Sequence, residues 1–175
     1  MSPSRRILLF TGDGKGKTTA ALGMALRAAG HGMRVLVIQF IKNESHTGER
    51  TAISHLPQVD FLQVGRGFVP AESDEAFVVH REAARRGLTI VEERLKQGSY
   101  ALIVLDEICT ACALNLIKTE DVLQLIENSP PGVIWVLTGR GAPEALIEAA
   151  DTVTVMACRK HGLLKGFPAQ KGVEY

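Results

Sequence analysis

The chain has 175 residues, of which 46% are hydrophobic and 22% are charged, and its formal net charge at pH 7 is +1. This length and balance are typical of one globular domain and exclude a disordered or fibrous protein. A net charge so close to zero provides no broad positive field to attract nucleic acid or an anionic membrane surface, so neither is expected as a partner. We therefore expect a single domain over residues 1–175 that acts on a small molecule.

The sequence predicts neither secretion nor membrane insertion. The first apolar run ends at Phe10 and is too short for the core of a signal peptide. No stretch approaches the roughly 20 apolar residues that span a bilayer. The three cysteines, Cys109, Cys112 and Cys158, are an odd number in a chain long enough to fold without disulfides. These features favour a reducing compartment, and we expect a cytoplasmic protein.

Six short runs rich in isoleucine, valine and leucine are expected to be strands. Because they lack polar alternation, they should be buried on both faces, as in a mainly parallel sheet. They cover residues 7–10, 35–40, 60–64, 101–105, 133–137 and 152–156. Helices are expected over residues 18–29, 73–97, from 119 to before the prolines at 130 and 131, and over 143–149.

Strand and helix therefore alternate along the chain. This order predicts an α/β fold of the P-loop NTPase kind, with a doubly wound sheet and helices on both faces. Ligands of such sheets bind at the carboxyl ends of the strands. The glycine-rich residues 162–175 are expected to form a loop or hairpin that could close over this site.

A glycine-rich segment directly follows the first expected strand and precedes the first expected helix. It reads Thr11-Gly12-Asp13-Gly14-Lys15-Gly16-Lys17-Thr18-Thr19. In such a loop the backbone N–H groups point at phosphate oxygens, and the helix N-terminus adds partial positive charge. Lys17 is expected to reach terminal phosphates, and the Thr18 hydroxyl to bind a Mg²⁺ or Mn²⁺ ion that bridges them. Thr11 stands where the strict pattern has glycine, and a glycine-rich turn without a ligand is the alternative.

Two acidic residues, Asp106 and Glu107, directly follow the expected strand 101–105. A phosphate-loop protein needs a second metal contact at this place. Adjacent residues on a strand point to opposite faces, so one carboxylate is expected at the metal while the other orients a neighbour or a water. Either Asp106 or Glu107 could be the residue at the metal. The alternative is that the pair is only a solvated strand end followed by a helix cap.

Further candidates for binding follow other strands. Arg140 is expected at the same sheet edge and could pair with triphosphate oxygens, with a solvent-facing turn as the alternative. Lys42, Glu49 and Arg50 lie in a polar loop where the base, the ribose or a second substrate could bind. Phe68 lies on a glycine loop and contacts either a substrate or the core.

The cysteines suggest one rival interpretation. Cys109-x-x-Cys112 and Cys158-x-x-His161 have spacings compatible with a structural zinc site. The alternative is that these small thiols pack in the interior, as free cysteines commonly do.

Taken together, these motifs resemble the P-loop type ATP:corrinoid adenosyltransferases of cobalamin biosynthesis and salvage. The resemblance covers residues 7–175 and depends on several blocks in a fixed order, which makes it more specific than a phosphate loop. The blocks are residues 10–21, 37–42, 48–50, 67–68, 104–107, 137–141, 150–153 and 169–175.

The resemblance implies that the Co(I) of a reduced corrinoid attacks the 5′ carbon of ATP and expels triphosphate. Such a reaction needs positioning and charge neutralisation rather than a catalytic base. The family further implies ATP reversed relative to ordinary P-loop enzymes, a homodimer, and a reductase that supplies Co(I). Lys17, Thr18 and Phe68 are then the expected catalytic residues. ATP is expected to bind the loop from Gly12 to Thr19 together with Lys42, Arg50 and Arg140.

Two features depart from the family pattern. Family members often have a longer N-terminal arm that covers the partner's active site, whereas here only a few residues precede the first expected strand. Where they typically read Phe-Thr-Trp-Glu-Thr, this chain reads Phe68-Val69-Pro70-Ala71-Glu72, so the tryptophan associated with the lower corrinoid face is absent. The alternative functions are a P-loop ATPase or small-molecule kinase, which would release ADP, and a non-catalytic nucleotide-binding or corrinoid-binding module.

Overall fold

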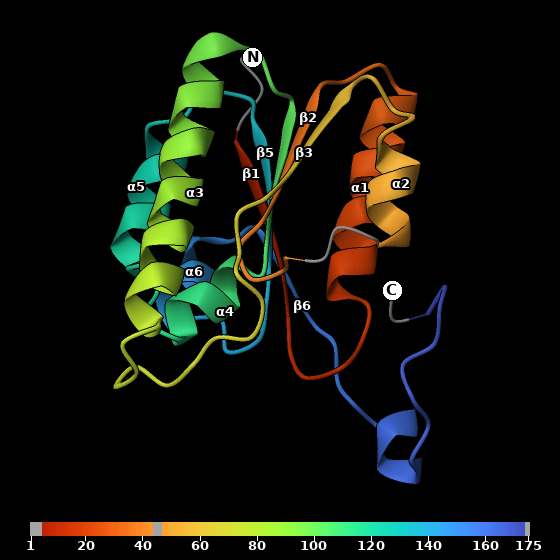
Figure 1. The fold of residues 1–175 in the computed structure, drawn as a ribbon. Helices are drawn as coiled ribbons and strands as arrows, with labels where there is room; N and C mark the ends of the chain where they lie inside the picture. The colour runs from red at the N-terminus through yellow and green to blue at the C-terminus, as the bar shows by residue number, and fades with distance from the viewer. Residues whose placement is uncertain (1–4, 44–46, 174–175) are drawn as a thin grey trace.

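A six-stranded parallel sheet forms the centre of the computed structural model, which describes residues 5–43 and 47–173 (Figure 1). The strands are β1 (Arg6–Thr11), β2 (Val35–Gln39), β3 (Val59–Gln63), β4 (Leu102–Asp106), β5 (Ile134–Thr138) and β6 (Thr152–Val155). They lie in the order β3-β2-β4-β5-β1-β6, and each adjacent pair is parallel. The predicted α/β fold and its six strands are confirmed. The ends of the expected domain, residues 1–4 and 174–175, lie outside the described residues.

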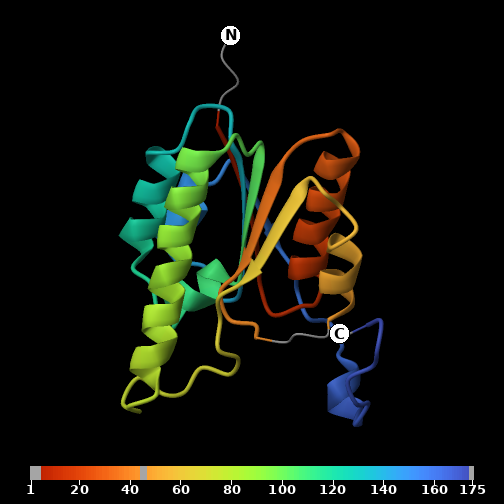
Figure 2. The same ribbon diagram turned by 45° about the horizontal axis from the view of Figure 1, so that its top comes forward.

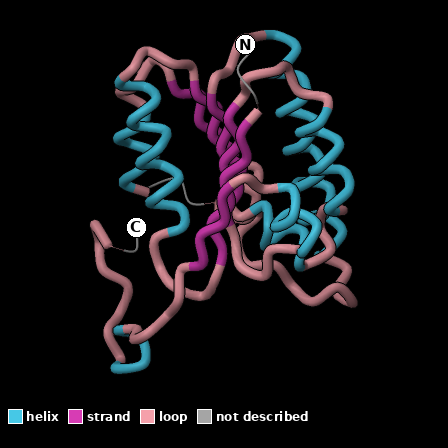
Figure 3. The backbone as a smooth tube through the Cα atoms, turned by 180° about the vertical axis from the view of Figure 1, so that it is seen from behind, coloured by secondary structure: helices cyan, strands magenta, loops and turns pink. Residues whose placement is uncertain are grey.

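Helices cover both faces of this sheet (Figures 1 and 2). On one face lie α1 (Lys17–Gly30) and α2 (Gly48–Ile53). On the other lie α3 (Phe77–Gln97), α4 (Ile108–Ala113), α5 (Thr119–Glu127) and α6 (Glu144–Ala149). From behind, the sheet is seen between these two helical layers (Figure 3). Within residues 5–43 and 47–173, none of the helices combines the length and apolar character that a bilayer crossing requires.

Alternation along the strands divides the core between the two faces. In β2, Val35 and Val37 pack in the cluster beneath α1, while Leu36 and Ile38 belong to the cluster beneath α3 and α5. All four side chains are fully buried. Successive side chains of a strand point to opposite faces, so a continuous apolar run satisfies both layers.

The structure differs from the sequence prediction at three helices and at the end of the chain. The long helix begins at Phe77 instead of residue 73, because Asp74 Oδ1 accepts a hydrogen bond from the Ala76 amide and holds a turn there. The expectation that Glu49 and Arg50 lie in a loop is wrong, because both belong to the short helix α2. The short helix α4 was not specifically predicted. Described residues after β6 form a 3₁₀ turn, Gly162–Lys165, and a loop, so the hairpin alternative is wrong within that part.

The strand order places the functional loops together. The chain leaves β1, crosses in α1 over β4 and β5, and returns to the sheet as β2 on the far side of these strands. The N-terminus of α1 therefore lies beside the carboxyl ends of β4 and β5. This is where ligands bind in open parallel sheets.

Candidate active site

The loop between β1 and α1 is shaped by its glycines and by its packing on the chain after β6. Gly12 and Gly16 have φ angles of 96° and 113°, a left-handed conformation that glycine adopts without strain. The Gly14 amide donates to the Met156 carbonyl at 2.7 Å, and a Cβ added to Gly14 would lie 2.7 Å from that same oxygen. Only glycine therefore fits at this approach, and the loop has the curled backbone that phosphate binding requires.

Lys17 is held against this loop. Its side chain is buried, and Nζ donates to the carbonyl oxygens of Gly12 at 2.6 Å and Gly14 at 2.7 Å. Burial lowers the pKa of Lys17, and the nearby Glu107 carboxylate partly opposes this effect. The ammonium group thus lies at the loop that a phosphate would occupy.

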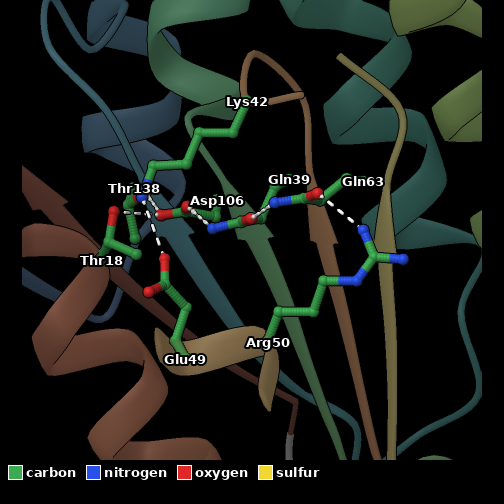
Figure 4. Close-up of polar contacts among 8 residues, drawn as sticks. All are labelled: Thr18, Gln39, Lys42, Glu49, Arg50, Gln63, Asp106 and Thr138. Atoms are coloured by element: carbon green, nitrogen blue, oxygen red, sulfur yellow. Dashed lines mark hydrogen bonds and ion pairs between the residues drawn. The ribbon is translucent and has the colours of Figure 1, made fainter. Parts of the chain in front are cut away.

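Asp106 is fully buried at the end of β4 and accepts three hydrogen bonds (Figure 4). Its Oδ1 accepts from the hydroxyls of Thr18 at 2.8 Å and Thr138 at 2.7 Å. Its Oδ2 accepts from Nε2 of Gln39 at 2.8 Å. The Thr18 hydroxyl and the carboxylate are hard oxygen donors of the kind that Mg²⁺ prefers. No cluster of three or more His, Cys, Asp or Glu that could hold a metal ion forms among the described residues.

Glu107 follows in a strained conformation. Its φ of 62° and ψ of 21° lie in the left-handed region, which is uncommon for a residue with a side chain. Its amide donates to the Thr138 hydroxyl at 2.9 Å, and its carboxylate accepts from the Thr110 hydroxyl. Strain of this kind costs about 1–3 kcal/mol and clusters at functional sites. The bend places Glu107 among the residues lining the cavity described next.

A cavity of about 1000 Å³ opens between the phosphate loop, α1 and α2. Its polar end is formed by loop residues 13–19 with Lys42, Glu49, Glu107, Thr110 and Arg140. Its apolar end is formed by Leu22, Ala25 and Leu26 of α1, by Ala52 and Ile53 of α2, and by Leu56 and Val59. Gly172 and Val173, near the end of the chain, also line it. The cavity can therefore hold a ligand with a highly charged end and an apolar end.

Of the remaining predicted binding residues, some line the cavity and others do not. Lys42 and Glu49 form an ion pair at 3.4 Å and line the cavity, as does the exposed Arg140. Among the described residues, those lining the cavity do not include Arg50, whose Nη1 instead donates to Oε1 of Gln63 at 3.2 Å. Phe68 is 94% exposed, so the alternative that it packs in the core is wrong.

Several polar residues of the site were not predicted from the sequence. Gln39, Gln63 and Thr138 end their strands with side chains directed to the α1 face, and Thr110 contacts Glu107 from α4. The available signal was a polar residue at the last inward-facing position of an apolar strand. Such a residue needs a hydrogen-bonding partner when buried.

The cysteines do not assemble a metal site. Cys109 and Cys112 are buried, whereas Cys158 is exposed. Burial raises the pKa of Cys109 to about 12 and that of Cys112 to about 11. All four residues of the zinc alternative are described, and no candidate cluster contains them. The alternative prediction, that the cysteines pack in the interior, is confirmed for Cys109 and Cys112 and is wrong for Cys158.

Comparison with known proteins yields one consistent family. The family described as ATP:corrinoid adenosyltransferase BtuR/CobO/CobP matches residues 4–175. A corrinoid adenosyltransferase of Pseudomonas aeruginosa is 40% identical over 171 residues, which cover 97% of this chain and 83% of the relative. A corrinoid adenosyltransferase of Escherichia coli K12 is 37% identical over 174 residues, which cover 97% of this chain and 85% of the relative. The corrinoid adenosyltransferase CobA of Salmonella typhimurium LT2 is 36% identical over 172 residues, covering 97% and 85%.

Proposed function

Because the chain belongs to the ATP:corrinoid adenosyltransferase family, we propose that it transfers the 5′-deoxyadenosyl group of ATP to the Co(I) centre of a reduced corrinoid, releasing triphosphate in adenosylcobalamin biosynthesis or salvage. The observation that carries this proposal is the cavity with a phosphate loop at one end and apolar walls from α1 and α2 at the other. These two ends suit the triphosphate and the apolar surfaces of the reactants.

The reaction is a substitution at carbon. The electron pair of Co(I) forms the cobalt–carbon bond to the 5′ carbon of ATP, and the bond from this carbon to the triphosphate oxygen breaks. That electron pair leaves with triphosphate, and the cobalt becomes formally Co(III). No proton has to move in this step, so the protein contributes orientation and stabilisation of the departing charge.

The polar end of the cavity supplies this stabilisation. The loop amides, the Lys17 ammonium and the Arg140 guanidinium would neutralise the triphosphate. Lys17 must first exchange its bonds to the carbonyls of Gly12 and Gly14 for phosphate oxygens. Thr18, Asp106 and Glu107 would hold Mg²⁺, which adds positive charge beside the triphosphate.

The corrinoid and the assembly are assigned from the family. Phe68 belongs to the loop after β3, at the carboxyl edge of the sheet, and its exposed ring is proposed to contact the corrinoid. Lys42 is proposed to contact ATP from the cavity wall. The enzyme is proposed to act in the cytoplasm as a homodimer, with a reductase supplying Co(I).

An ATP analogue with a β,γ-imido bridge tests which bond breaks. Adenosyl transfer breaks only the bond at the 5′ carbon, so this analogue should support formation of the adenosylated corrinoid and release imidotriphosphate. An analogue with a methylene group in place of the 5′ oxygen is the control, because it should bind without reacting. Turnover of ATP to ADP, with no reaction of the imido analogue, would establish the kinase or ATPase alternative instead.

A further inference from the structure

We infer that Gln39 and Gln63 are positioning residues that link Arg50 to Asp106 through a one-way chain of hydrogen bonds (Figure 4). Arg50 Nη1 donates to Oε1 of Gln63 at 3.2 Å. Nε2 of Gln63 donates to Oε1 of Gln39 at 2.8 Å, and Nε2 of Gln39 donates to Oδ2 of Asp106 at 2.8 Å. The assignment of Asp106 to a Mg²⁺ site rests on the proposed function.

The linked residues form one row across the sheet. In the parallel register, Gln39 of β2 is paired with Gln63 of β3 on one side and with Asp106 of β4 on the other. Thr138 of β5 continues the row through its hydrogen bond to Asp106. This polar row, Gln63-Gln39-Asp106-Thr138, occupies the last position of each strand that faces α1. Earlier positions on this face, such as Val37, are apolar core residues.

Arg50 and Asp106, the two ends of this chain of hydrogen bonds, fix the direction in which each bond is donated. A guanidinium group only donates hydrogen bonds, whereas an ionised carboxylate only accepts them. Each glutamine amide must therefore present its oxygen toward Arg50 and its nitrogen toward Asp106. Gln39 is fully buried, so a rotated amide there would leave polar atoms without partners. Aligned amides in a low-dielectric interior also strengthen one another.

The polar row connects a wall of the cavity to the metal position. Arg50 belongs to α2, a helix of six residues in which Ile53 is the buried side chain. The preceding residue, Glu49, lines the cavity and pairs with Lys42. At the other end of the chain, Asp106 accepts from the Thr18 hydroxyl, a proposed metal ligand. Gln39 and Gln63 thus hold α2 and the Asp106 carboxylate in a fixed relation without touching ATP themselves.

The first test measures ATP affinity without corrinoid, once with saturating Mg²⁺ and once with a chelator. Residues that orient metal ligands typically change metal affinity about 10- to 100-fold, so Gln39→Leu should weaken Mg²⁺-dependent binding by this amount and metal-free binding by less than about twofold. Gln124→Leu, on the exposed face of α5, is the control and should change neither. An equal loss under both conditions would show a merely structural role and overturn the inference.

Two substitutions of Gln63 separate the bonds of the chain and remain informative if Gln39→Leu does not fold. Gln63→Glu keeps an acceptor for Arg50 but cannot donate to Gln39, whereas Gln63→Met removes both bonds. Both should weaken Mg²⁺-dependent ATP binding. Normal Mg²⁺-dependent binding by the folded Gln63→Glu protein would overturn the inference, because it would show that the bond to Gln39 is dispensable.

A double-mutant cycle tests the link between the ends. Arg50→Met should weaken Mg²⁺-dependent binding in the native background and add nothing in the Gln39→Leu background. If Arg50 instead contacted ATP directly, the losses of Mg²⁺-dependent ATP affinity in the two single variants would add. Additive losses would contradict the proposed link from Arg50 to Asp106. Because these measurements use no corrinoid, they can succeed or fail independently of the proposed adenosyl transfer.

Discussion

Lys17 combines two demands in one side chain. Its ammonium group must be charged to bind triphosphate, yet it is buried against the carbonyls of Gly12 and Gly14. Burial disfavours the charged form and lowers the pKa of Lys17, while the nearby Glu107 carboxylate favours the charged form. The residue is thus held ready at the loop in a form that phosphate would further stabilise.

Replacing Lys17 tests its contribution to the transition state. Removing a group that stabilises developing charge typically costs a factor of about 100 to 1000 in rate, so Lys17→Met should lower kcat/KM by this amount. Lys96→Met, at the exposed end of α3, should retain normal kinetics. Steady-state kinetics of both proteins, with their melting temperatures, provide the measurement. A Lys17→Met enzyme with nearly normal kcat/KM would contradict the assignment.

The lowered pKa of Lys17 has a consequence at alkaline pH. ATP binding to the free enzyme should weaken as the pH rises through a value below 10.5, the ordinary pKa of lysine. Bound triphosphate favours the ammonium form, so the alkaline limb of kcat should lie at higher pH than that of kcat/KM. Between the lowered native pKa and 10.5, the unfolded chain binds more protons, and Lys17 therefore makes stability rise with pH. The Lys17→Met protein should show neither alkaline limb, in kcat or in kcat/KM, and should lack this rise of stability with pH.

The three cysteines should differ in reactivity. Burial keeps Cys109 and Cys112 protonated at neutral pH by raising the pKa of both thiols, while Cys158 is exposed. Titration with a thiol reagent should modify one cysteine rapidly in the native protein and all three in denaturant. Mass spectrometry should locate the fast modification at Cys158. Rapid native modification of Cys109 or Cys112 would contradict the packing described above.

At the scale of elements, the phosphate loop depends on the residues that follow β6. An alanine side chain at Gly14 would meet the carbonyl oxygens of Met156 at 2.7 Å and Ala157 at 2.8 Å, both backbone atoms. Gly14→Ala should therefore displace the loop and lower kcat/KM by a factor of about 100, the effect of a small misplacement of reacting groups.

The control for this substitution is Gly30, the last residue of α1, the helix that follows the phosphate loop. A Cβ added to Gly30 meets nothing within 4 Å. Gly30→Ala should leave kinetics unchanged and stabilise the protein by about 0.4–1 kcal/mol through the unfolded state. Equal kinetic losses in both variants, measured with thermal melting, would mean that the contact with Met156 is not decisive.

The longer elements could be predicted from the sequence because their signals are local. Continuous apolar runs such as residues 102–105 identify buried strands, and the loop before Lys17 identifies the start of α1. Short helices such as α2 depend on tertiary contacts, and isolated helices of this length are unstable, so propensity gives little signal. The start of α3 was misplaced because the hydrogen bond from the Ala76 amide to the Asp74 carboxylate holds a turn before Phe77.

The site could be predicted only in part. The loop was predicted from its glycine pattern and the Asp106-Glu107 pair from its position after an apolar strand. The other members of the polar row, Gln39, Gln63 and Thr138, were not predicted. Gln39 and Gln63 are 24 residues apart, and each is an ordinary strand end until the register of β2 and β3 pairs them. Their function emerges from strand order, which a single sequence does not specify.

At the scale of the whole molecule, topology assembles the cavity from distant segments. The crossing of α1 over β4 and β5 brings residues 13–19 beside Glu107 and Arg140, and α2 forms the facing wall. Residues 162–173 lie on the same side of the sheet as α1 (Figures 1 and 3), and Gly172 and Val173 among them line the cavity. The predicted role of this segment in closing the site, and the homodimer, remain predictions.

Adenosyl transfer itself is tested most directly by anaerobic incubation of the protein with magnesium-ATP and chemically reduced cobalamin. The visible bands of the Co(I) form should give way to those of the light-sensitive adenosyl form, with one triphosphate released per corrinoid consumed. Lys17→Met protein should leave the Co(I) bands unchanged over the same time. Release of ADP with unchanged Co(I) bands, or ATP binding without any product, would contradict the proposed function.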